Sequence, residues 1–507
     1  LYHGEDISKW NEKQMQKFRG EKCSIIFQDP MTSLNPVFTV GSQLIEAILL
    51  HTDKNKKEAW ARAVEMLTLV GVNEPESRMK QYPHELSGGM RQRVMIAMAI
   101  INHPDLIIAD EPTTALDIET QQEIMALLRE SCARQDCSML FVTHDLGLAE
   151  QIADRILVMK DGRIVEEGQS EQIFRDPQHA YTKKLLGYAA YGKGSSHYHG
   201  RIRAAQQEKI TQEETKQTEK EADDALLSIR GLSKSFPVDK HTRKQVFHDV
   251  SLAIHRGEIV GLIGPSGVGK STLARCIMGI CAPDSGEVIV REGVRIQMIF
   301  QDSASSLNQK MKVSDIITEP MRIQHITPPR GSYIKEAAFQ MEYVGLENSF
   351  LDRYPSELSG GQRQRVAIAR SLCMEPEFLV ADEPIASLDV SIQAQIVNLF
   401  RHLQEEHGFT FLFIAHDLAM VEYLCDRVGV MYHGKLVELA PSKELYSHPV
   451  HPYTKTLLSA IPVPDPIRER KRVLQYYDGE GMENSVWTEV SPGHFAMLPA
   501  EGKGCSI

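Results

Sequence analysis

The strongest constraint on the fold of this 507-residue chain is that it contains one unit twice. The segment PHELSGGMRQRV at 83–94 returns as PSELSGGQRQRV at 355–366, 272 residues later and with ten of twelve letters identical. PDLIIADEPTTALD (104–117) and PEFLVADEPIASLD (376–389) share that spacing, as do His144 and His416. IIFQDP and MIFQDS are offset by 273. Two copies at so long a period indicate a duplicated domain rather than a solenoid.

Short apolar runs alternate with helical patterns within each copy. EIVGLI (258–263), FLVAD (378–382) and FTFLFIAH (409–416) are typical of buried strands. The alternation predicts an α/β fold with parallel strands and helices on both faces of the sheet. The stretch between the Gln motif and the LSGG motif lacks such runs, which predicts an inserted helical subdomain.

A polar, charged stretch at 192–224 separates the two copies and predicts a linker, with some helix in its Gln/Glu/Lys portion. HYH at 197–199 has metal-chelating chemistry, but a solvated linker is the favoured interpretation. The predicted organisation is a first domain over 1–190, a linker over 191–225, a second domain over 226–462 and a tail over 463–507.

Composition limits the partners. The net charge of −12 gives no support for nucleic-acid binding. No apolar run approaches the roughly 18–20 residues that span a bilayer, so a membrane role would come through a partner. No secretory signal is recognisable. The eight cysteines lack paired CxxC spacing. CARQDC (132–137) and CIMGIC (276–281) each hold two thiols, whereas a metal site would need more ligands nearby, so reduced, structural cysteines are predicted.

A phosphate-binding loop follows the strand EIVGLI and opens a helical pattern. Its sequence, GPSGVGKST, matches G-x-x-x-x-G-K-[ST] in the strand–loop–helix context that the motif requires. Lys270 is predicted to neutralise β- and γ-phosphate charge, and Ser271 to ligate Mg²⁺. The predicted loop residues are Gly264, Pro265, Ser266, Gly267, Val268, Gly269, Lys270, Ser271 and Thr272.

Polar side chains follow three predicted strands at the edge where α/β proteins bind ligands. Asp382 is predicted to hold Mg²⁺, and Glu383 to polarise the attacking water as general base. His416 is placed to contact the γ-phosphate and hold that water. The amide of Gln301 can touch both Mg²⁺ and the water. The counterparts in the first copy are Gln28, Asp110, Glu111 and His144.

The repeated LSGG motif precedes a strongly helical run. Serine is a good N-cap, glycines permit close backbone approach, and a helix start attracts anions. The second copy therefore carries two phosphate-binding elements, and if both lie on one face, two such domains can sandwich nucleotide head to tail. The residues concerned are Ser87, Gly88 and Gly89 in one copy and Ser359, Gly360, Gly361 and Gln362 in the other.

Together these motifs resemble the ATPase subunits of ABC transporters, over the chain to about residue 460. The resemblance implies two tandem P-loop ATPase domains, each with a mixed sheet core and an inserted helical subdomain. It also implies that each ATP lies between the phosphate loop of one domain and the signature of the other. Phe236, in LSKSFPV, is the residue it implies for stacking on adenine, with ordinary packing as the alternative.

Two flanking segments are similar to the oligopeptide/dipeptide/nickel importer branch, in which tandem fused ATPases occur. They are FQDPMTSLNP (27–36) and HPVHPYTKTLLSAIP (448–462), with DPQHAYTKKLLGYA (176–189) as a weaker copy. This similarity implies two permease subunits, an extracytoplasmic solute-binding protein, and a peripheral position on the cytoplasmic face of the inner membrane. Permease coupling helices would dock near 28–50 and 301–325. Peptide, glutathione and nickel stay open as cargo, with peptide favoured on family frequency.

The first copy departs from this pattern twice. The counterpart of Lys270 would fall before Leu1, which with the missing initial Met favours an N-terminally incomplete chain over a degenerate site. Met90 stands where the signature usually has Gln. In a head-to-tail dimer the intact loop faces this LSGGM signature. The serine and the glycines of this signature are retained, so Met90 is predicted to have only a mild effect on ATP hydrolysis.

Three rival interpretations are weaker. A soluble tandem ATPase acting on ribosomes would share every ATPase motif, but typically has a longer, basic linker and no HPYTK-like tail. A DNA-repair ATPase would need cysteine-rich zinc modules. A scaffold without activity would not need Glu383 and His416 beside an intact loop. The sequence therefore favours an importer ATPase.

Overall fold

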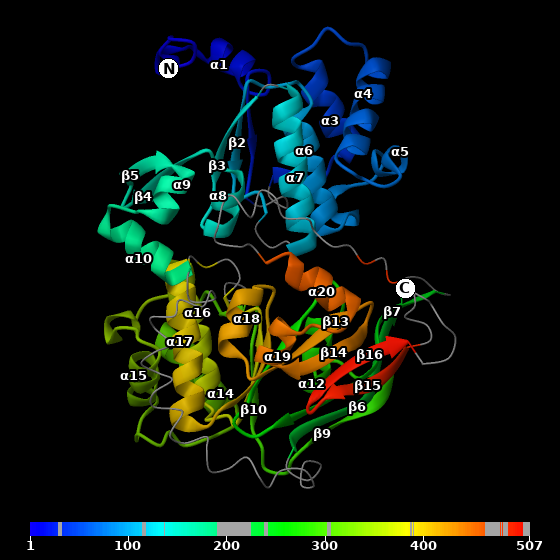
Figure 1. The fold of residues 1–507 in the computed structure, drawn as a ribbon. Coiled ribbons are helices and arrows are strands. Elements are labelled where there is room, and N and C mark those ends of the chain that lie inside the picture. Colours follow the sequence, from blue (N-terminus) through cyan, green and yellow to red (C-terminus); the bar gives the residue numbers. More distant parts are fainter. Residues whose placement is uncertain are drawn as a thin grey trace. The chain divides into compact units, whose positions relative to one another are not determined.

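The computed structural model describes residues 1–28, 33–113, 118–135, 137–189, 225–237, 242–301, 306–385, 388, 390–461, 477, 479 and 485–499. These residues form two compact units, unit 1 (Leu1–Thr182) and unit 2 (Lys183–Ile461 with the described residues after 471) (Figure 1). The predicted linker up to residue 224, including HYH at 197–199, and most of the ASLD turn (386–389) lie outside the described residues.

An eight-stranded sheet forms the core of unit 2. Its order in space is β10 (Ile296–Ile299), β11 (Phe378–Asp382), β12 (Thr410–Ile414), β8 (Ile259–Ile263), β13 (Arg427–Tyr432), β14 (Lys435–Pro441), β16 (His494–Pro499) and β15 (Ser485–Ser491). The first five strands pair in parallel, and the last three join antiparallel. β8, β11 and β12 are buried throughout, as expected for parallel strands covered on both faces. The sheet is therefore mixed rather than purely parallel.

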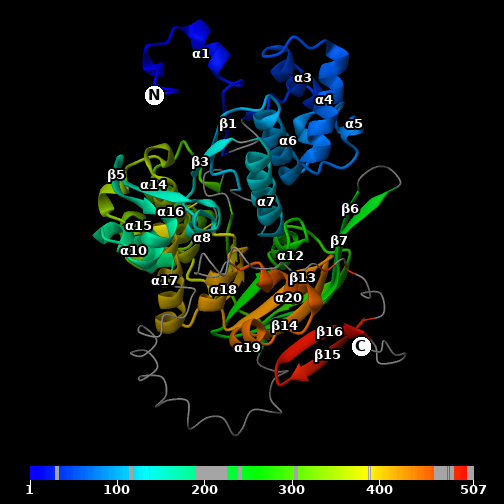
Figure 2. The same cartoon turned by 45° about the horizontal axis from the view of Figure 1, so that its top comes forward.

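A second, antiparallel sheet in unit 2 has the order β7 (Arg243–His255), β6 (Ala225–Pro237) and β9 (Ser285–Val290). The β6–β7 hairpin projects beside the main sheet (Figure 2). Buried side chains such as Phe247 and Leu252 pack against Val260 and Leu262 of β8 in one hydrophobic cluster. The hairpin is thereby held against the strand that leads into the phosphate loop.

The helices of unit 2 include the predicted helical subdomain, in which α14 and α15 pack against each other and against α16. This confirms the insertion between the Gln motif and the signature. The bounds are α12 (Lys270–Ile277), α14 (Val313–Ile323), α15 (Tyr333–Tyr343), η4 (Asn348–Phe350), η5 (Pro355–Glu357), α16 (Gly360–Leu372), α17 (Val390–His407), α18 (Leu418–Leu424), α19 (Ser442–Ser447) and α20 (Pro452–Ser459).

Unit 1 repeats these parts on smaller sheets. β1 (Cys23–Ile26), β2 (Leu106–Asp110) and β3 (Ser138–Val142) form a parallel sheet, and β4 (Arg155–Lys160) pairs antiparallel with β5 (Arg163–Gln169). The helices in this half of the chain are η1 (Ile7–Lys9), α1 (Glu12–Phe18), α3 (Val40–Leu49), α4 (Lys56–Leu69), α5 (Pro75–Arg78), η2 (Pro83–Glu85), α6 (Gly88–Ile100), α7 (Ile118–Gln135), α8 (Leu146–Ile152), α9 (Ser170–Arg175) and α10 (Ala180–Ala189).

The units differ at the centre of the sheet. In unit 2, β8 lies between β12 and β13 and pairs with both. Among the described strands of unit 1, none lies between the counterparts β3 and β4, which belong to separate sheets. Leu140 on β3 and Leu157 on β4 are consequently 47% and 46% exposed, whereas β12 is buried throughout. The described part of unit 1 therefore has neither the central strand nor the phosphate loop that this strand would carry.

The C-terminal hairpin β15–β16 was not predicted from the sequence. It extends the main sheet beyond β14 (Figure 1). His494 is buried and its Nε2 lies 2.7 Å from Oε1 of the buried Glu438 on β14. The same carboxylate accepts hydrogen bonds from the backbone N–H groups of Val450 and His451 at 2.9 Å each. In the described part of the chain, no helix is long and apolar enough to cross a bilayer.

Candidate nucleotide site

The phosphate loop joins β8 to α12 as the motif requires. Gly264 has a φ of 145° and Gly269 a φ of 109°, which L side chains rarely adopt. A Cβ at Gly269 would also lie 2.9 Å from the Val246 side chain of β7. The Lys270 side chain is buried, and its Nζ donates to the carbonyl oxygens of Gly264 at 2.7 Å and Pro265 at 3.0 Å. The glycines thus let the loop curl tightly around the lysine.

Ser271 and Asp382 come together next to this loop. The Ser271 Oγ donates to Oδ1 of Asp382 at 2.9 Å, and Asp382 is only 3% exposed at the end of β11. Burial raises the pKa of Asp382, although the hydrogen bond from Ser271 opposes the shift. A buried carboxylate and a hydroxyl are hard oxygen ligands, so this pair fits Mg²⁺. Within the described residues, no cluster of three or more His, Cys, Asp or Glu side chains forms a separate metal site.

Glu383 is held by the two side chains that the sequence placed beside it. Its Oε2 accepts from Gln301 Nε2 at 2.5 Å, and its Oε1 lies 3.4 Å from Nδ1 of His416. Burial opposes the ionisation of both groups. Their mutual hydrogen bond and charges outweigh it, so that the pKa of Glu383 is lowered and that of His416 is raised. The site therefore holds a carboxylate ionised near neutral pH.

Unit 1 assembles the same three side chains. Gln28 Nε2 donates to Oε2 of Glu111 at 2.6 Å, and His144 Nδ1 lies 2.8 Å from Oε1 of Glu111. Asp110 ends β2 immediately before them. Glu111 and Glu383 both adopt a left-handed backbone, with φ of 45° and 46°. In each unit the structure thus brings the glutamine, the glutamate and the histidine together, and their catalytic roles stay predictions.

Both signatures start a helix as predicted. Ser87 Oγ accepts from the Met90 N–H, and Ser359 Oγ accepts from the Gln362 N–H, each at 3.3 Å. Gln362 Oε1 also accepts from the Ser359 N–H at 2.9 Å, which completes a capping box. Met90 has no side-chain oxygen, so α6 lacks this second bond. Instead, Met90 packs against the hydrophobic core of unit 1.

The second glycines of the two signatures permit close packing of helices. A Cβ at Gly361 would lie 2.7 Å from Ile392 at the start of α17, and one at Gly89 would lie 3.4 Å from Thr120 of α7. Among the described residues, a Cβ at Gly88 would meet nothing within 4 Å. The first glycine of this signature is thus free of contacts from the described part of the chain, whereas the second packs against α7.

Phe236 lies near the end of β6 and is 41% exposed. It pairs with Lys244 on β7, two residues before Val246, which contacts Gly269 of the phosphate loop. The Lys234 Nζ lies 5.3 Å from the centroid of the Phe236 ring. The ring is thus available on the hairpin that borders the loop, as base stacking would require.

A cavity of about 600 Å³ lies between the sheet edge and the helical subdomain of unit 2. Gln301 and Asp382 of the nucleotide site form part of its wall, together with α14 and α16. The sequence predictions missed its charged lining residues, because isolated charges on helices carry no motif. The lining residues are Arg275, Gln297, Met298, Phe300, Gln301, Ser306, Glu319, Pro320, Ile323, Gln324, Arg370, Ser371 and Asp382.

Comparison with known proteins decides the family. The ABC transporter model matches residues 1–114 and 247–386. The chain is 40% identical over 536 residues to the glutathione import ATP-binding protein GsiA of Salmonella typhimurium (strain LT2), covering 99% of this chain and 86% of that protein. The chain belongs to the ABC transporter ATP-binding family. GsiA of Escherichia coli (strain K12) is 40% identical over 528 residues, covering 97% of this ABC ATPase and 84% of that protein.

The model of the C-terminal region of oligopeptide/dipeptide transporters matches this ABC ATPase at 165–216 and 437–479. A dimeric ATP-binding cassette bound to ADP and Pi is 27% identical, with a TM-score of 0.39, over 43% of this chain and 98% of that one. The predicted oligopeptide branch, tandem ATPase fold and ATP hydrolysis are confirmed. The protein is an ATPase subunit that energises an ABC importer, and the ribosome-acting alternative finds no support.

Proposed function

We propose that this ATPase powers the import of a peptide or a related small solute, such as glutathione, from the cytoplasmic face of the inner membrane. The observation that carries the proposal is the assembled site of unit 2. The loop with Lys270 is complete, Ser271 meets Asp382, and Glu383 is held by Gln301 and His416. The names of the relatives support glutathione as the cargo. The match to the oligopeptide/dipeptide transporter family supports peptides as the class of cargo.

Ser271, Asp382 and Gln301 would hold Mg²⁺ in unit 2, with Gln28 and Asp110 as counterparts in unit 1. When bound, the ion would supply charge neutralisation at the phosphates. Lys270 would leave its loop carbonyls and donate to phosphate oxygens, because an anion is a stronger acceptor than a neutral carbonyl. Glu383 would orient a water and take its proton at Oε2 or Oε1 as the water attacks. His416 would hold the carboxylate and contact the γ-phosphate.

The loop of unit 2 would work with the signature of unit 1. Ser87, Gly88 and Gly89 would close over ATP bound at Lys270, through an N-terminal helix end that attracts anions. Nucleotide would favour the closed arrangement because its γ-phosphate adds contacts that only this state makes. Hydrolysis would remove them and reopen the pair. Motion between the units would then be passed to two permeases.

The permeases would dock near 28–50 in unit 1 and 301–325 in unit 2. The cavity beside α14 supports this, because Gln301 on its wall also contacts Glu383. A coupling helix seated there would be linked to the catalytic carboxylate by one side chain. An extracytoplasmic binding protein and the permeases would select the cargo, which the ATPase would not contact.

Affinity purification of the native protein from detergent-solubilised membranes tests the proposal. We expect two multi-spanning permeases to copurify and to be identified by mass spectrometry. A Lys270→Ala variant serves as a control, because it should retain the permeases while losing ATP binding. Copurification of ribosomal proteins, or of no membrane protein, would overturn the transport function.

A further inference from the structure

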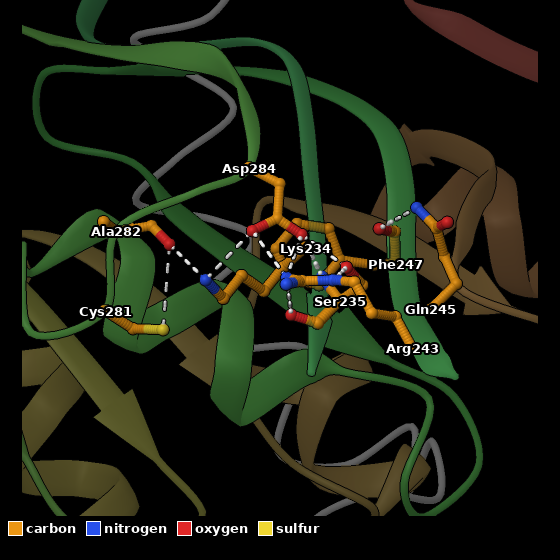
Figure 3. Close-up of polar contacts among 8 residues, drawn as sticks. All are labelled: Lys234, Ser235, Arg243, Gln245, Phe247, Cys281, Ala282 and Asp284. Atoms are coloured by element: carbon orange, nitrogen blue, oxygen red, sulfur yellow. Dashed lines mark hydrogen bonds and ion pairs between the residues drawn. The ribbon is translucent and has the colours of Figure 1, made fainter. Parts of the chain in front are cut away.

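The segment that precedes Phe236 is fixed by one carboxylate. Asp284 lies in the turn between α12 and β9, and its Oδ2 accepts from both the backbone N–H and the Oγ of Ser235 at 2.6 Å (Figure 3). The backbone N–H of Asp284 in turn donates to the Ser233 carbonyl at 2.8 Å. The turn and β6 are therefore joined by three hydrogen bonds within a few residues of the exposed ring.

Two cations converge on the same carboxylate. Lys234 Nζ lies 3.3 Å from Oδ1, and Arg243 Nη2 lies 3.3 Å from each oxygen. Arg243 also donates to Ser235, from Nε to Oγ at 2.8 Å and from Nη2 to the carbonyl at 3.0 Å. Figure 3 shows these groups gathered around Asp284 from both strands of the hairpin. The hydrogen bonds from Ser235 and the charge of Lys234 lower the pKa of Asp284 to about 2, so it stays ionised.

Lys234 connects this cluster to the ring. Its ammonium donates to the Ala282 carbonyl at 2.5 Å, and it lies within cation–π range of Phe236. On the opposite strand, Val246 lies against Gly269 of the phosphate loop. Hence the cluster ties the turn after α12, the hairpin and the aromatic ring to the loop that binds phosphate.

We propose that Asp284 is a positioning residue for the adenine base: it fixes Ser235, Lys234 and Arg243, and so holds Phe236 ready to stack. This rests on the proposed nucleotide site at Lys270. A ring fixed before binding loses less conformational freedom when the base arrives, which raises affinity without any added contact. The phosphates are held by the loop, so the contribution of Asp284 concerns the base alone.

The test compares ATP with inorganic tripolyphosphate, which has the phosphates but no base. Asp284→Asn keeps the shape and removes the charge. We expect Asp284→Asn to weaken ATP binding by about five- to tenfold, which is less than the full loss expected when a stacking aromatic ring is removed. Binding of tripolyphosphate should not change. Phe236→Ala should give the same pattern, and the double variant no more than Phe236→Ala alone. Asp249→Asn is the matched control, since Asp249 is an exposed aspartate on the same hairpin.

Thermal unfolding of each variant separates positioning from a general structural effect. A normal ATP affinity for Asp284→Asn beside a weakened Phe236→Ala would overturn the role of Asp284 and leave the nucleotide site standing. An equal loss of affinity for ATP and for tripolyphosphate in Asp284→Asn would also overturn the positioning role. So would a fall in melting temperature large enough to explain the loss of affinity by unfolding. Lys270→Ala should weaken both ligands; if it weakened neither, the proposed site itself would fail.

Discussion

At the scale of single residues, Glu383 is defined by its contacts rather than by its backbone. A φ of 46° is uncommon for a non-glycine residue, and strained residues often occur at functional sites. Glu375, however, has the same φ, and among the described residues its side chain forms an exposed ion pair with Arg295. What distinguishes Glu383 is that Gln301 and His416 hold its carboxylate beside the phosphate loop. The same set recurs around Glu111.

The first prediction concerns this carboxylate. Glu383→Gln should lower the hydrolysis rate by about a hundredfold or more, because loss of a general base typically costs that much, while ATP stays bound. Lys270→Ala should instead weaken binding. Glu375→Gln is the matched control, with the same backbone conformation and the same change of group. An unaltered ATPase rate for Glu383→Gln would refute its assignment.

The second prediction concerns pH. Burial raises the pKa of Glu383, and the hydrogen bond and charge of His416 outweigh it. The ion pair exists above the lowered pKa of Glu383 and is lost as pH rises through the raised pKa of His416. In His416→Ala, burial still raises the pKa of Glu383 while the opposing effect of the histidine is lost, so this pKa should be higher. The acidic limb of the ATPase rate should therefore move to higher pH. Rate profiles that run from about pH 4, where an ordinary glutamate titrates, to about pH 8, above the histidine range, measure this shift. A shift to lower pH would contradict it.

At the scale of elements, the two signature helices differ by one hydrogen bond. α16 has the reciprocal bond from Ser359 N–H to Gln362, and α6 lacks it because Met90 replaces the glutamine. The serine and the two glycines, which are proposed to face phosphate, are the same in both signatures. A difference in stability is therefore expected to exceed any difference in catalysis.

Met90→Gln tests this third prediction. It should change hydrolysis by less than about tenfold, or about 1.4 kcal/mol of barrier. The new capping bond should also raise the free energy of unfolding by part of the roughly 0.5–2 kcal/mol that a helix cap contributes. The lost packing of the Met90 side chain should offset some of this gain. ATPase assays and urea unfolding report the two effects. A hundredfold change in rate would show that the residue takes part in catalysis.

The C-terminal hairpin gives the fourth prediction. His494→Ala would leave the buried Glu438 without the hydrogen bond to this side chain, which should lower the free energy of unfolding by about 1–3 kcal/mol. His448→Ala, at an exposed position near the same strand, is the control. Urea unfolding followed by tryptophan fluorescence suits the measurement, since Trp487 lies on β15. Equal stability of the two variants would mean that the hairpin is not held by this pair.

At the scale of the whole molecule, the sequence predicted most of the nucleotide site and less of the framework. The loop, Asp382, Glu383 and the helical insertion follow from local patterns that carry chemistry. The β6–β7–β9 sheet and the C-terminal hairpin were missed, because strand pairing over long distances depends on burial and not on local sequence. SVWTEVS (485–491) holds β-branched and aromatic residues that are typical of strands, but its apolar and polar residues do not alternate, so the sequence carries no clear strand pattern.

Duplication makes the central claim testable within one chain. Unit 2 carries the loop described here, and its partner signature is proposed to be that of unit 1. The two signatures have almost the same sequence, and in both of them the serine Oγ caps the start of the helix. Each is therefore the control for the other, and a bulky cation placed at either serine should block only the site that this signature completes.

The most direct measurement is ATP hydrolysis by Ser87→Arg and Ser359→Arg, each with a binding assay for ATP. The account predicts that Ser87→Arg removes the hydrolysis that depends on Lys270, while Ser359→Arg leaves it nearly unchanged. Loss of that hydrolysis in Ser359→Arg with normal activity in Ser87→Arg would contradict the account. It would mean that the phosphate loop of unit 2 works with the signature of unit 2 in a second copy of the chain.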